Sequence, residues 1–239
     1  MRGICIAFPT VRATVMARER GCLQAAFWAS SIRPRSLPNR HTELLRRRCH
    51  EEAERMSYCK GQVLNVARDP QHRFGKQIQE NITLIQAYGV DGDAHAGHYA
   101  KHRFIARRLT TLRNMRQIHL IPAELFAELR NQGHIVGPGE LGENVATLGL
   151  KLEHLPLGTR LHLGRTAVVE LTGIRTPCRQ IDRFKKGLKQ EMLRTDATGP
   201  KYRCGVLGII MIGGRVLPGD LARAKISQKP TLPCRHCRT

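Results

Sequence analysis

The sequence predicts a mainly β protein with a few helices, closed into a barrel or a sandwich. Short runs of apolar and β-branched residues recur along the chain after residue 60, and turns rich in glycine and proline separate them. Beyond that point, only two stretches space their apolar residues as a helix does. Many short strands with frequent turns and few helices are typical of closed all-β architectures.

The first half of this region contains three predicted strands and one helix. Residues 61–67 alternate between two faces, and residues 82–87 form a second, β-branched run. Residues 117–121 are a third predicted strand. Pro122 then opens a helix over residues 123–131, because proline is tolerated in a first helical turn.

The second half is predicted to consist mostly of strands. Residues 159–163 and 166–171 flank Gly164-Arg165, a pair typical of a two-residue hairpin turn. A long apolar strand follows over residues 203–212, and a last strand covers residues 221–226. The regular spacing of these strands and turns supports a closed sheet.

The chain is strongly basic, with a net charge of +21 over 239 residues. Such a field attracts polyanions and small phosphorylated ligands. Aromatic residues make up only 5% of the chain, and the sequence shows no nucleic-acid-binding motif. We therefore expect the charge to serve solubility and small anions, with weak, salt-sensitive binding to random DNA and no specific nucleic-acid recognition.

The first 57 residues differ from the rest in composition. They hold eleven arginines, no lysine and five acidic residues, and no sustained apolar period appears before residue 41. We expect residues 1–57 to be a basic, disordered extension, residues 58–227 a domain, and residues 228–239 a flexible tail. The Arg-rich start is also compatible with an organelle transit peptide, or with translated sequence upstream of a natural start at Met56.

Eight cysteines are spread irregularly along the chain, so their spacing predicts no disulfide framework. We infer a reducing compartment and expect the cytoplasm, with organelle targeting as the alternative. The longest uncharged apolar run, residues 204–214, is about half the length of a membrane span, so we expect no transmembrane helix and no membrane partner. Cys234 and Cys237 form half a zinc site at most, and free thiols are the favoured interpretation.

Cys178 stands at a predicted strand-to-helix junction. A strand leads into it, and a helical pattern of apolar residues over 180–193 follows. The positive end of a helix and two neighbouring arginines, Arg175 and Arg179, would favour the thiolate, which attacks electrophiles and binds soft metals. The alternative is a buried structural cysteine, the usual state of a free thiol.

Two loops carry further candidate residues. The loop of residues 90–99 holds His95, His98 and two aspartates, which are compatible with metal binding or with local polar turns. Its glycines argue against the helix that would align the histidines, so the turn interpretation is favoured. The glycine-rich loop of residues 137–144 shapes a wide turn, or it brings backbone amides and Asn144 close to a ligand.

Five short motifs resemble those of the MOSC domain, a family named after the C-terminal domain of molybdenum cofactor sulfurase. They occur in the family's order, over about residues 58–227: Gly92-Asp-Ala-His-Ala-Gly97, Gly142-Glu-Asn-Val-Ala-Thr-Leu-Gly149, Leu157-Gly-Thr-Arg-Leu-His-Leu-Gly164, Arg175-Thr-Pro-Cys178 and Gly213-Gly-Arg-Val-Leu-Pro-Gly-Asp220. The resemblance implies a closed, barrel-like MOSC fold. It also implies the molybdenum cofactor, molybdopterin with its metal, as the ligand.

The resemblance gives one cysteine a role. The family's single cysteine falls on Cys178, which is expected to bind molybdenum or to carry sulfur for it. A thiolate is the soft donor that such a site would use, and charge-assisted hydrogen bonds from arginines suit the pterin phosphate. The expected cofactor contacts are Arg175, Arg179 and Arg203 for the phosphate, Asn144 for the pterin edge, and Gly142 and His95 from the matching motifs.

Two functions follow from the resemblance. Some stand-alone members of the family reduce N-hydroxylated bases and amidoximes with electrons from a reductase, and this sequence shows no flavin or iron–sulfur motif. We therefore expect a molybdenum-cofactor enzyme that reduces N-hydroxylated compounds with a flavin or iron–sulfur reductase as its partner. The alternative is a non-catalytic carrier that delivers the cofactor or sulfur.

Overall fold

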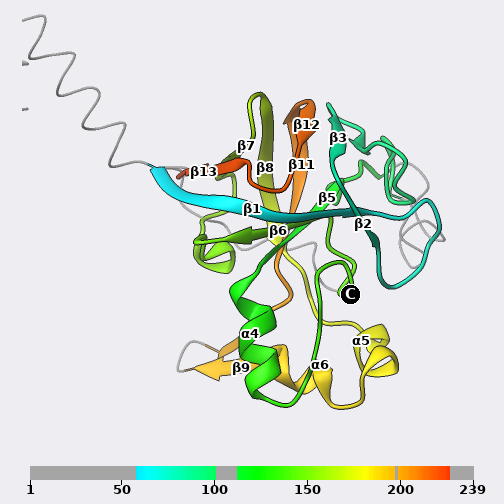
Figure 1. The fold of residues 1–239 in the computed structure, drawn as a ribbon, viewed down its shortest axis with the longest axis vertical. Coiled ribbons are helices and arrows are strands. Elements are labelled where there is room, and N and C mark those ends of the chain that lie inside the picture. The colour runs from blue at the N-terminus through cyan, green and yellow to red at the C-terminus, as the bar shows by residue number, and fades with distance from the viewer. Residues whose placement is uncertain (1–57, 101–111, 197–198, 227–239) are drawn as a thin grey trace, which may run out of the picture. The chain divides into compact units, whose positions relative to one another are not determined.

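The computed structural model of the protein describes residues 58–100, 112–196 and 199–226. Its central element is a closed barrel of seven strands (Figure 1). In order around the barrel, the strands are β13 (Leu221–Lys225), β7 (Arg160–Leu163), β8 (Ala167–Ile174), β11 (Val206–Ile212), β5 (Ile118–Pro122), β6 (Val145–Leu148) and β1 (Tyr58–Arg68). Pairing of β1 with β13 closes the barrel, which removes the unpaired edges of an open sheet.

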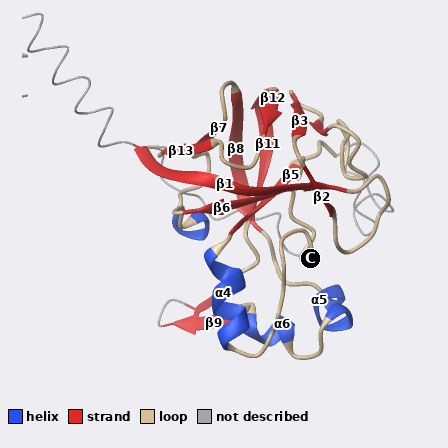
Figure 2. Ribbon diagram, viewed as in Figure 1, coloured by secondary structure: helices blue, strands red, loops and turns tan. Residues whose placement is uncertain are grey.

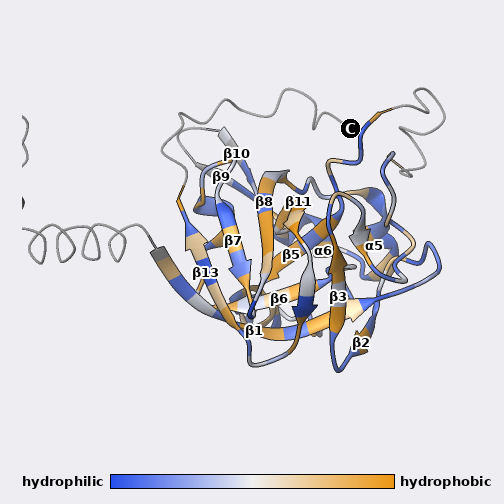
Figure 3. Cartoon of the chain, turned by 90° about the horizontal axis from the view of Figure 1, so that it is seen from above, coloured by the Kyte–Doolittle hydropathy of each residue, from blue (hydrophilic) through white to orange (hydrophobic). Residues whose placement is uncertain are grey.

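Alternation along the strands fills the inside of the barrel with small and branched side chains. In β13, Ala222 and Ala224 are buried while their neighbours are exposed. Val169 of β8 and Leu161 of β7 belong to the same core. The hydropathy colouring shows β5 and β8 as strongly hydrophobic strands (Figure 3).

Shorter strands extend the barrel on one side. β2 (Gln77–Gln79) pairs with the end of β1. β3 (Ile82–Ile85) pairs with both β4 (Gly89–Val90) and β12 (Gly214–Val216). The loop that follows β4 folds back onto the loop that follows β1, where the Ala94 N–H donates to the Asp69 carbonyl at 2.8 Å. Residues of two predicted loops are thereby brought together.

A helical layer covers the outside of β5 and β6. It contains α4 (Glu124–Asn131), α5 (Arg179–Phe184), α6 (Leu188–Glu191) and the hairpin of β9 (Leu193–Asp196) and β10 (Gly199–Tyr202), while the short 3-10 turn η1 (Leu152–His154) follows β6. The three α-helices lie below the barrel in the view of Figure 2. Ile121 and Ala146 pack into this layer, whereas Leu120 and Val145 next to them face the barrel core. β5 and β6 are thus buried on both faces, as parallel strands usually are.

Two predicted elements differ in the structure. The helix predicted over 180–193 is broken into α5 and α6, because Gly187 adopts a left-handed φ of 83° and Lys185 is extended. The hairpin between β7 and β8 has a three-residue loop, since Leu163 pairs with Ala167. The hairpin of β9 and β10 was not predicted, because its residues carry no alternating apolar pattern.

The fold class and the remaining predicted strands are confirmed, with β1, β3, β5, β11 and β13 close to their predicted bounds. The predicted helix after Pro122 is α4, which begins at Glu124. The predicted extension, residues 1–57, and the predicted tail, residues 228–239, lie outside the described residues. In the described part of the chain, no helix is long and apolar enough to cross a membrane.

Candidate functional site

Cys178 lies at the predicted strand-to-helix junction. β8 ends at Ile174, and Cys178 is the N-cap residue of α5, with an extended backbone at φ −103° and ψ 170°. Its side chain is partly buried and packs on the apolar cluster of the helical layer together with Phe74 and Phe184. The thiol is therefore neither enclosed in the core nor isolated on the surface.

A cavity of about 520 Å³ lies beside this junction. Its walls come from the loop after β1 and from α5. The rings of Phe74 and Phe184 form an aromatic pair in its wall, with centroids 5.5 Å apart. Three of its lining residues are basic and two are acidic, namely Arg73, Lys76, Arg183, Asp69 and Glu140. The cavity therefore combines an aromatic surface with excess positive charge.

Arg175 points toward the protein interior. Its Nη1 donates to the Leu141 carbonyl at 2.5 Å and to Nδ1 of His119 at 3.2 Å. Its backbone N–H donates to the Gly205 carbonyl at 2.9 Å, which continues the pairing of β8 with β11. Arg175 thus connects the segment leading to Cys178 with the glycine-rich loop and with β5.

His119 was missed by the sequence analysis, because a lone histidine in an apolar strand carries no motif. It is buried, and its Nε2 lies 2.7 Å from the Cys204 carbonyl, which can only accept a hydrogen bond. Nε2 therefore carries the hydrogen, and Nδ1 accepts from Arg175. Burial, together with the charge of Arg175, lowers the pKa of His119 well below its ordinary value. His119 is neutral at physiological pH.

Asn144 is a buried connector. Its Oδ1 accepts from the backbone N–H of His119 at 3.2 Å. Its Nδ2 donates to the Ala67 carbonyl at 3.1 Å and to Asp93 Oδ2 at 2.9 Å. Both amide hydrogens are used by these contacts. The Asn144 side chain therefore has no free N–H to donate to a cofactor. Its hydrogen bonds instead connect three segments of the chain.

Asp93 and Lys76 form a buried ion pair that the sequence analysis did not single out. Lys76 Nζ donates to Asp93 Oδ2 at 2.5 Å, and the two side chains are 6% and 2% exposed. Burial raises the pKa of Asp93, but hydrogen bonds from His95 and the charge of Lys76 outweigh it and hold this pKa well below its usual range. Burial lowers the pKa of Lys76, and Asp93 opposes that shift.

His95 lies at the outer end of this pair. Its backbone N–H donates to Asp93 Oδ1 at 2.9 Å, and its Nδ1 lies 3.3 Å from the same oxygen. The side chain is 43% exposed, and its ring meets His72 edge-on. His98 packs on Tyr88 instead. The two histidines of this loop therefore have different neighbours, which agrees with the polar-turn interpretation.

The glycine-rich loop packs its backbone against the loop after β1. Gly139 and Gly142 have φ values of 82° and 77°. A Cβ on Gly139 would collide with the Lys76 carbonyl, and one on Gly142 with the Phe74 carbonyl. Glycine is required at both positions by conformation and by close approach. The loop is thus the turn that was predicted, and it supports one wall of the cavity.

Glu143 is a second buried carboxyl group that the sequence analysis missed. Its Oε1 accepts from the Gly139 N–H, while Oε2 is buried without a hydrogen-bond partner. Burial raises the pKa of Glu143, and the nearby charges of Arg175 and Lys76 oppose the shift. Glu143 therefore adds a buried carboxyl group beside the charges of Arg175 and Lys76.

Arg175, Arg179 and Arg203 have different surroundings. Arg179 is exposed as the first residue of α5. Arg203 pairs with Glu128 on α4. The side chain of Arg175 donates hydrogen bonds to His119 and to the Leu141 carbonyl of the glycine-rich loop. The predicted cluster of three arginines therefore has no shared partner within the described residues.

The described residues contain no group of three or more His, Cys, Asp or Glu placed to hold a metal ion. A metal here would have to bring most of its own ligands. Cys178 offers one soft donor, whereas burial raises the pKa of Cys204 to about 12.

The family model of the MOSC domain matches residues 91–223, which is more than half of the chain. This protein belongs to the MOSC domain family. The family is associated with the molybdenum cofactor. The matched range of this MOSC domain contains Cys178, Arg175, Asn144 and His95, while β1, which closes the barrel, precedes it.

Two solved structures share the fold of this MOSC domain. The crystal structure of the YUAD protein of Bacillus subtilis aligns with a TM-score of 0.58 at 22% identity, covering 72% of this chain and 98% of that one. A crystal structure described as that of a hypothetical protein aligns with a TM-score of 0.53 at 19% identity, covering 75% and 72%. These likenesses concern the fold. No curated protein gave a significant match.

Proposed function

We propose that this MOSC-domain protein binds the molybdenum cofactor through Cys178 and reduces N-hydroxylated compounds with electrons from a partner reductase. The observation that carries the proposal is the contrast between two neighbouring thiols. Cys178 is partly exposed at the start of α5, two residues before Gln180 of the cavity lining, whereas Cys204 is buried, which raises its pKa to about 12. Of these two thiols, only Cys178 combines access with a soft donor atom.

The cavity fits the cofactor in size and chemistry. A volume of about 520 Å³ lies within the range of small-molecule sites. Phe74 and Phe184 offer an aromatic surface to the pterin, and Arg73 and Arg183 offer charge to its phosphate. Arg179 is exposed next to Gln180, which lines the cavity, and is a further candidate for the phosphate.

The other predicted contacts support the site indirectly. Asn144 fixes Asp93, the partner of Lys76 in the cavity lining. Arg175 donates to the carbonyl of Leu141, the neighbour of Glu140 in that lining, and Gly142 allows the two loops to pack closely. Arg203 pairs with Glu128 on α4 and is the least supported of the predicted contacts. When bound, molybdenum supplies two-electron redox chemistry at the cavity. The residues of the cavity would hold the cofactor and orient it.

The test is to purify the protein from a host that makes the cofactor and to measure molybdenum and pterin per chain. Cys178→Ser should fold normally and lose the metal, because a serine hydroxyl is a hard, weakly acidic donor. Cys59→Ser is the matched control, since Cys59 is an exposed cysteine on β1. Retention of molybdenum by Cys178→Ser would contradict the proposal.

Reduction of an N-hydroxylated base by the loaded protein, with a chemical reductant, separates enzyme from carrier. The enzyme proposal expects turnover that disappears in Cys178→Ser and persists in Cys59→Ser. Loading without turnover, combined with transfer of the cofactor to an apoenzyme, would favour the carrier. A wild-type protein that takes up no molybdenum would overturn both functions.

A further inference from the structure

Lys76 is a cationic side chain that lines the cavity and is itself 6% exposed. Its Nζ is fixed by the 2.5 Å hydrogen bond to Asp93. Asp93 is in turn fixed by Asn144 at 2.9 Å and by the His95 N–H at 2.9 Å. The ammonium group is therefore held in one place by a carboxylate that cannot move freely.

Reduction of an N-hydroxylated compound consumes protons as well as electrons. The nitrogen–oxygen bond breaks, two electrons from the reductase enter, and two protons convert R–NH–OH into R–NH2 and water. The departing oxygen is a poor leaving group until it is protonated. A proton donor fixed at the cavity wall would meet this requirement.

We propose that Lys76 is the proton donor for the departing hydroxyl group, an inference that rests on the proposed function. The Lys76 ammonium gives its proton to the hydroxyl oxygen as the nitrogen–oxygen bond breaks, and the oxygen leaves as water. The nitrogen takes the second proton from solvent. The neutral Lys76 amine then regains a proton from water in the cavity. Asp93 keeps Nζ in position and favours its protonated form.

The surroundings of Lys76 make its ammonium group a stronger acid than that of an ordinary lysine. The charged and titratable groups that face it are Asp93, Glu143, Arg175 and His119. Burial lowers its pKa, Asp93 and Glu143 oppose that effect, and Arg175 adds to it. A lysine with a lowered pKa gives up its proton more readily than an ordinary one. His95, 43% exposed and bonded to the other oxygen of Asp93, links the pair to solvent.

The experiment compares the pH dependence of kcat for the loaded wild-type protein, Lys76→Met, Lys76→Arg and Asp93→Asn. Wild-type kcat should fall as pH rises through the pKa of Lys76, below the ordinary 10.5. Lys76→Met should lose about 100-fold or more in kcat, with KM and molybdenum content unchanged. Lys76→Arg should lose kcat as well and show no alkaline fall, since arginine keeps the charge but cannot give up its proton. In Asp93→Asn it should move to lower pH, because burial is then unopposed by that carboxylate.

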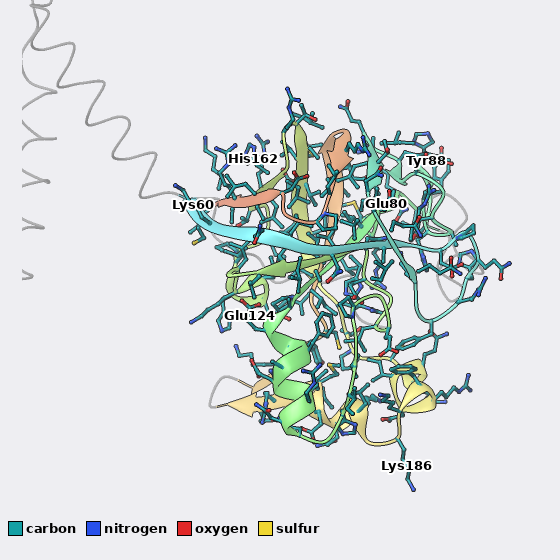
Figure 4. All side chains as sticks on the ribbon, in the orientation of Figure 1. Lys60, Glu80, Tyr88, Glu124, His162 and Lys186 are labelled. Atoms are coloured by element: carbon teal, nitrogen blue, oxygen red, sulfur yellow. The ribbon has the colours of Figure 1, made fainter. Side chains whose placement is uncertain are left out.

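A second measurement does not depend on turnover. Reductive methylation by formaldehyde requires a neutral amine, so its rate at Lys76, followed by peptide mass spectrometry, should rise with pH through the same pKa. The Asp93→Asn protein should show this rise at lower pH. Lys60, an exposed lysine on β1, is the internal reference, and Lys60→Met is the control variant for kcat (Figure 4).

The possible outcomes distinguish a failure of the proposed function from a failure of the proposed role of Lys76. Absence of molybdenum or of turnover in the wild-type protein would overturn the proposed function itself. Normal turnover with an unchanged kcat profile in Lys76→Met would overturn only the role of Lys76. Loss of molybdenum in Lys76→Met would also overturn it, because the lysine would then hold the cofactor. If the variants fail to fold, the wild-type protein alone provides the test. The proposal is wrong if the pH at which methylation of Lys76 rises differs from the pH at which kcat falls.

Discussion

Arg175 donates a hydrogen bond from Nη1 to Nδ1 of His119 across 3.2 Å, while Nε2 of the same ring is bonded to the Cys204 carbonyl. One neutral imidazole thus joins the segment before Cys178 to the strand that begins after Cys204. A residue without any sequence motif thereby connects two segments next to the site. It also yields predictions that can be separated from cofactor binding.

Arg175→Met should destabilise the protein by about 1–3 kcal/mol, because the Leu141 carbonyl and His119 Nδ1 lose their donor inside the protein. Arg179→Met removes the same charge from an exposed position and should stay within about 0.5 kcal/mol. Urea unfolding at pH 7.5 measures both. Equal effects of the two changes would show that the contacts of Arg175 carry no stability.

His119→Gln should change the acid dependence of stability. The folded pKa of His119 lies well below 6.5, so its contribution is complete above pH 6.5. As pH falls toward the folded pKa, only the unfolded state takes up the proton, and stability is lost by as much as about 1.4 kcal/mol per pH unit. The stability gap between wild type and variant should therefore narrow from pH 7 to pH 5. A gap that stays constant would contradict the buried, neutral state of His119.

Glu143→Gln should be tolerated better at high pH than at low pH. Burial raises the pKa of Glu143 above 4.5, so its contribution to stability is complete below pH 4.5 and is lost as pH rises through the folded pKa. Glutamine keeps an oxygen to accept from the Gly139 N–H and carries no charge. Relative to wild type, the variant should gain stability between pH 4.5 and pH 8 in denaturant titrations. A relative loss over that range would mean that Glu143 is stabilised as an anion.

Gly142→Ala should cost more than Gly133→Ala. Both residues have positive φ, at 77° and 85°, so both variants carry left-handed strain of about 1–2 kcal/mol. A Cβ at Gly133 meets nothing within 4 Å, whereas one at Gly142 collides with the Phe74 carbonyl and adds about 1–3 kcal/mol. Thermal unfolding gives the difference. Equal costs would show that the close approach of the two loops is not needed.

The division of the chain at residue 58 stays a prediction, since residues 1–57 lie outside the described part. A chain that begins at Met56 still contains every strand of the barrel. It should unfold at nearly the same temperature as the full chain in calorimetry. A loss of several degrees would show that the earlier residues contribute to the stability of the domain.

The fold class, most of the strands and the position of Cys178 at a strand-to-helix junction could be predicted from the sequence. Alternating apolar residues in β1 and β13 can be recognised locally, because a half-buried strand exposes every second side chain. The junction at Cys178 could be located because the pattern before it has the period of a strand and the pattern after it that of a helix. The glycine-rich loop was likewise recognised as a turn.

The hydrogen-bond partners of the buried polar residues could not be predicted from local sequence patterns. Asp93, Lys76 and Asn144 come from three separate loops, and closure of the barrel brings them within hydrogen-bond distance. The three arginines were predicted to act together because of their charge. In the structure, Arg175 contacts His119 and Arg203 pairs with Glu128. Hydrophobic periodicity is a local property of the chain, whereas buried polar groups take whichever partner the packed fold places beside them.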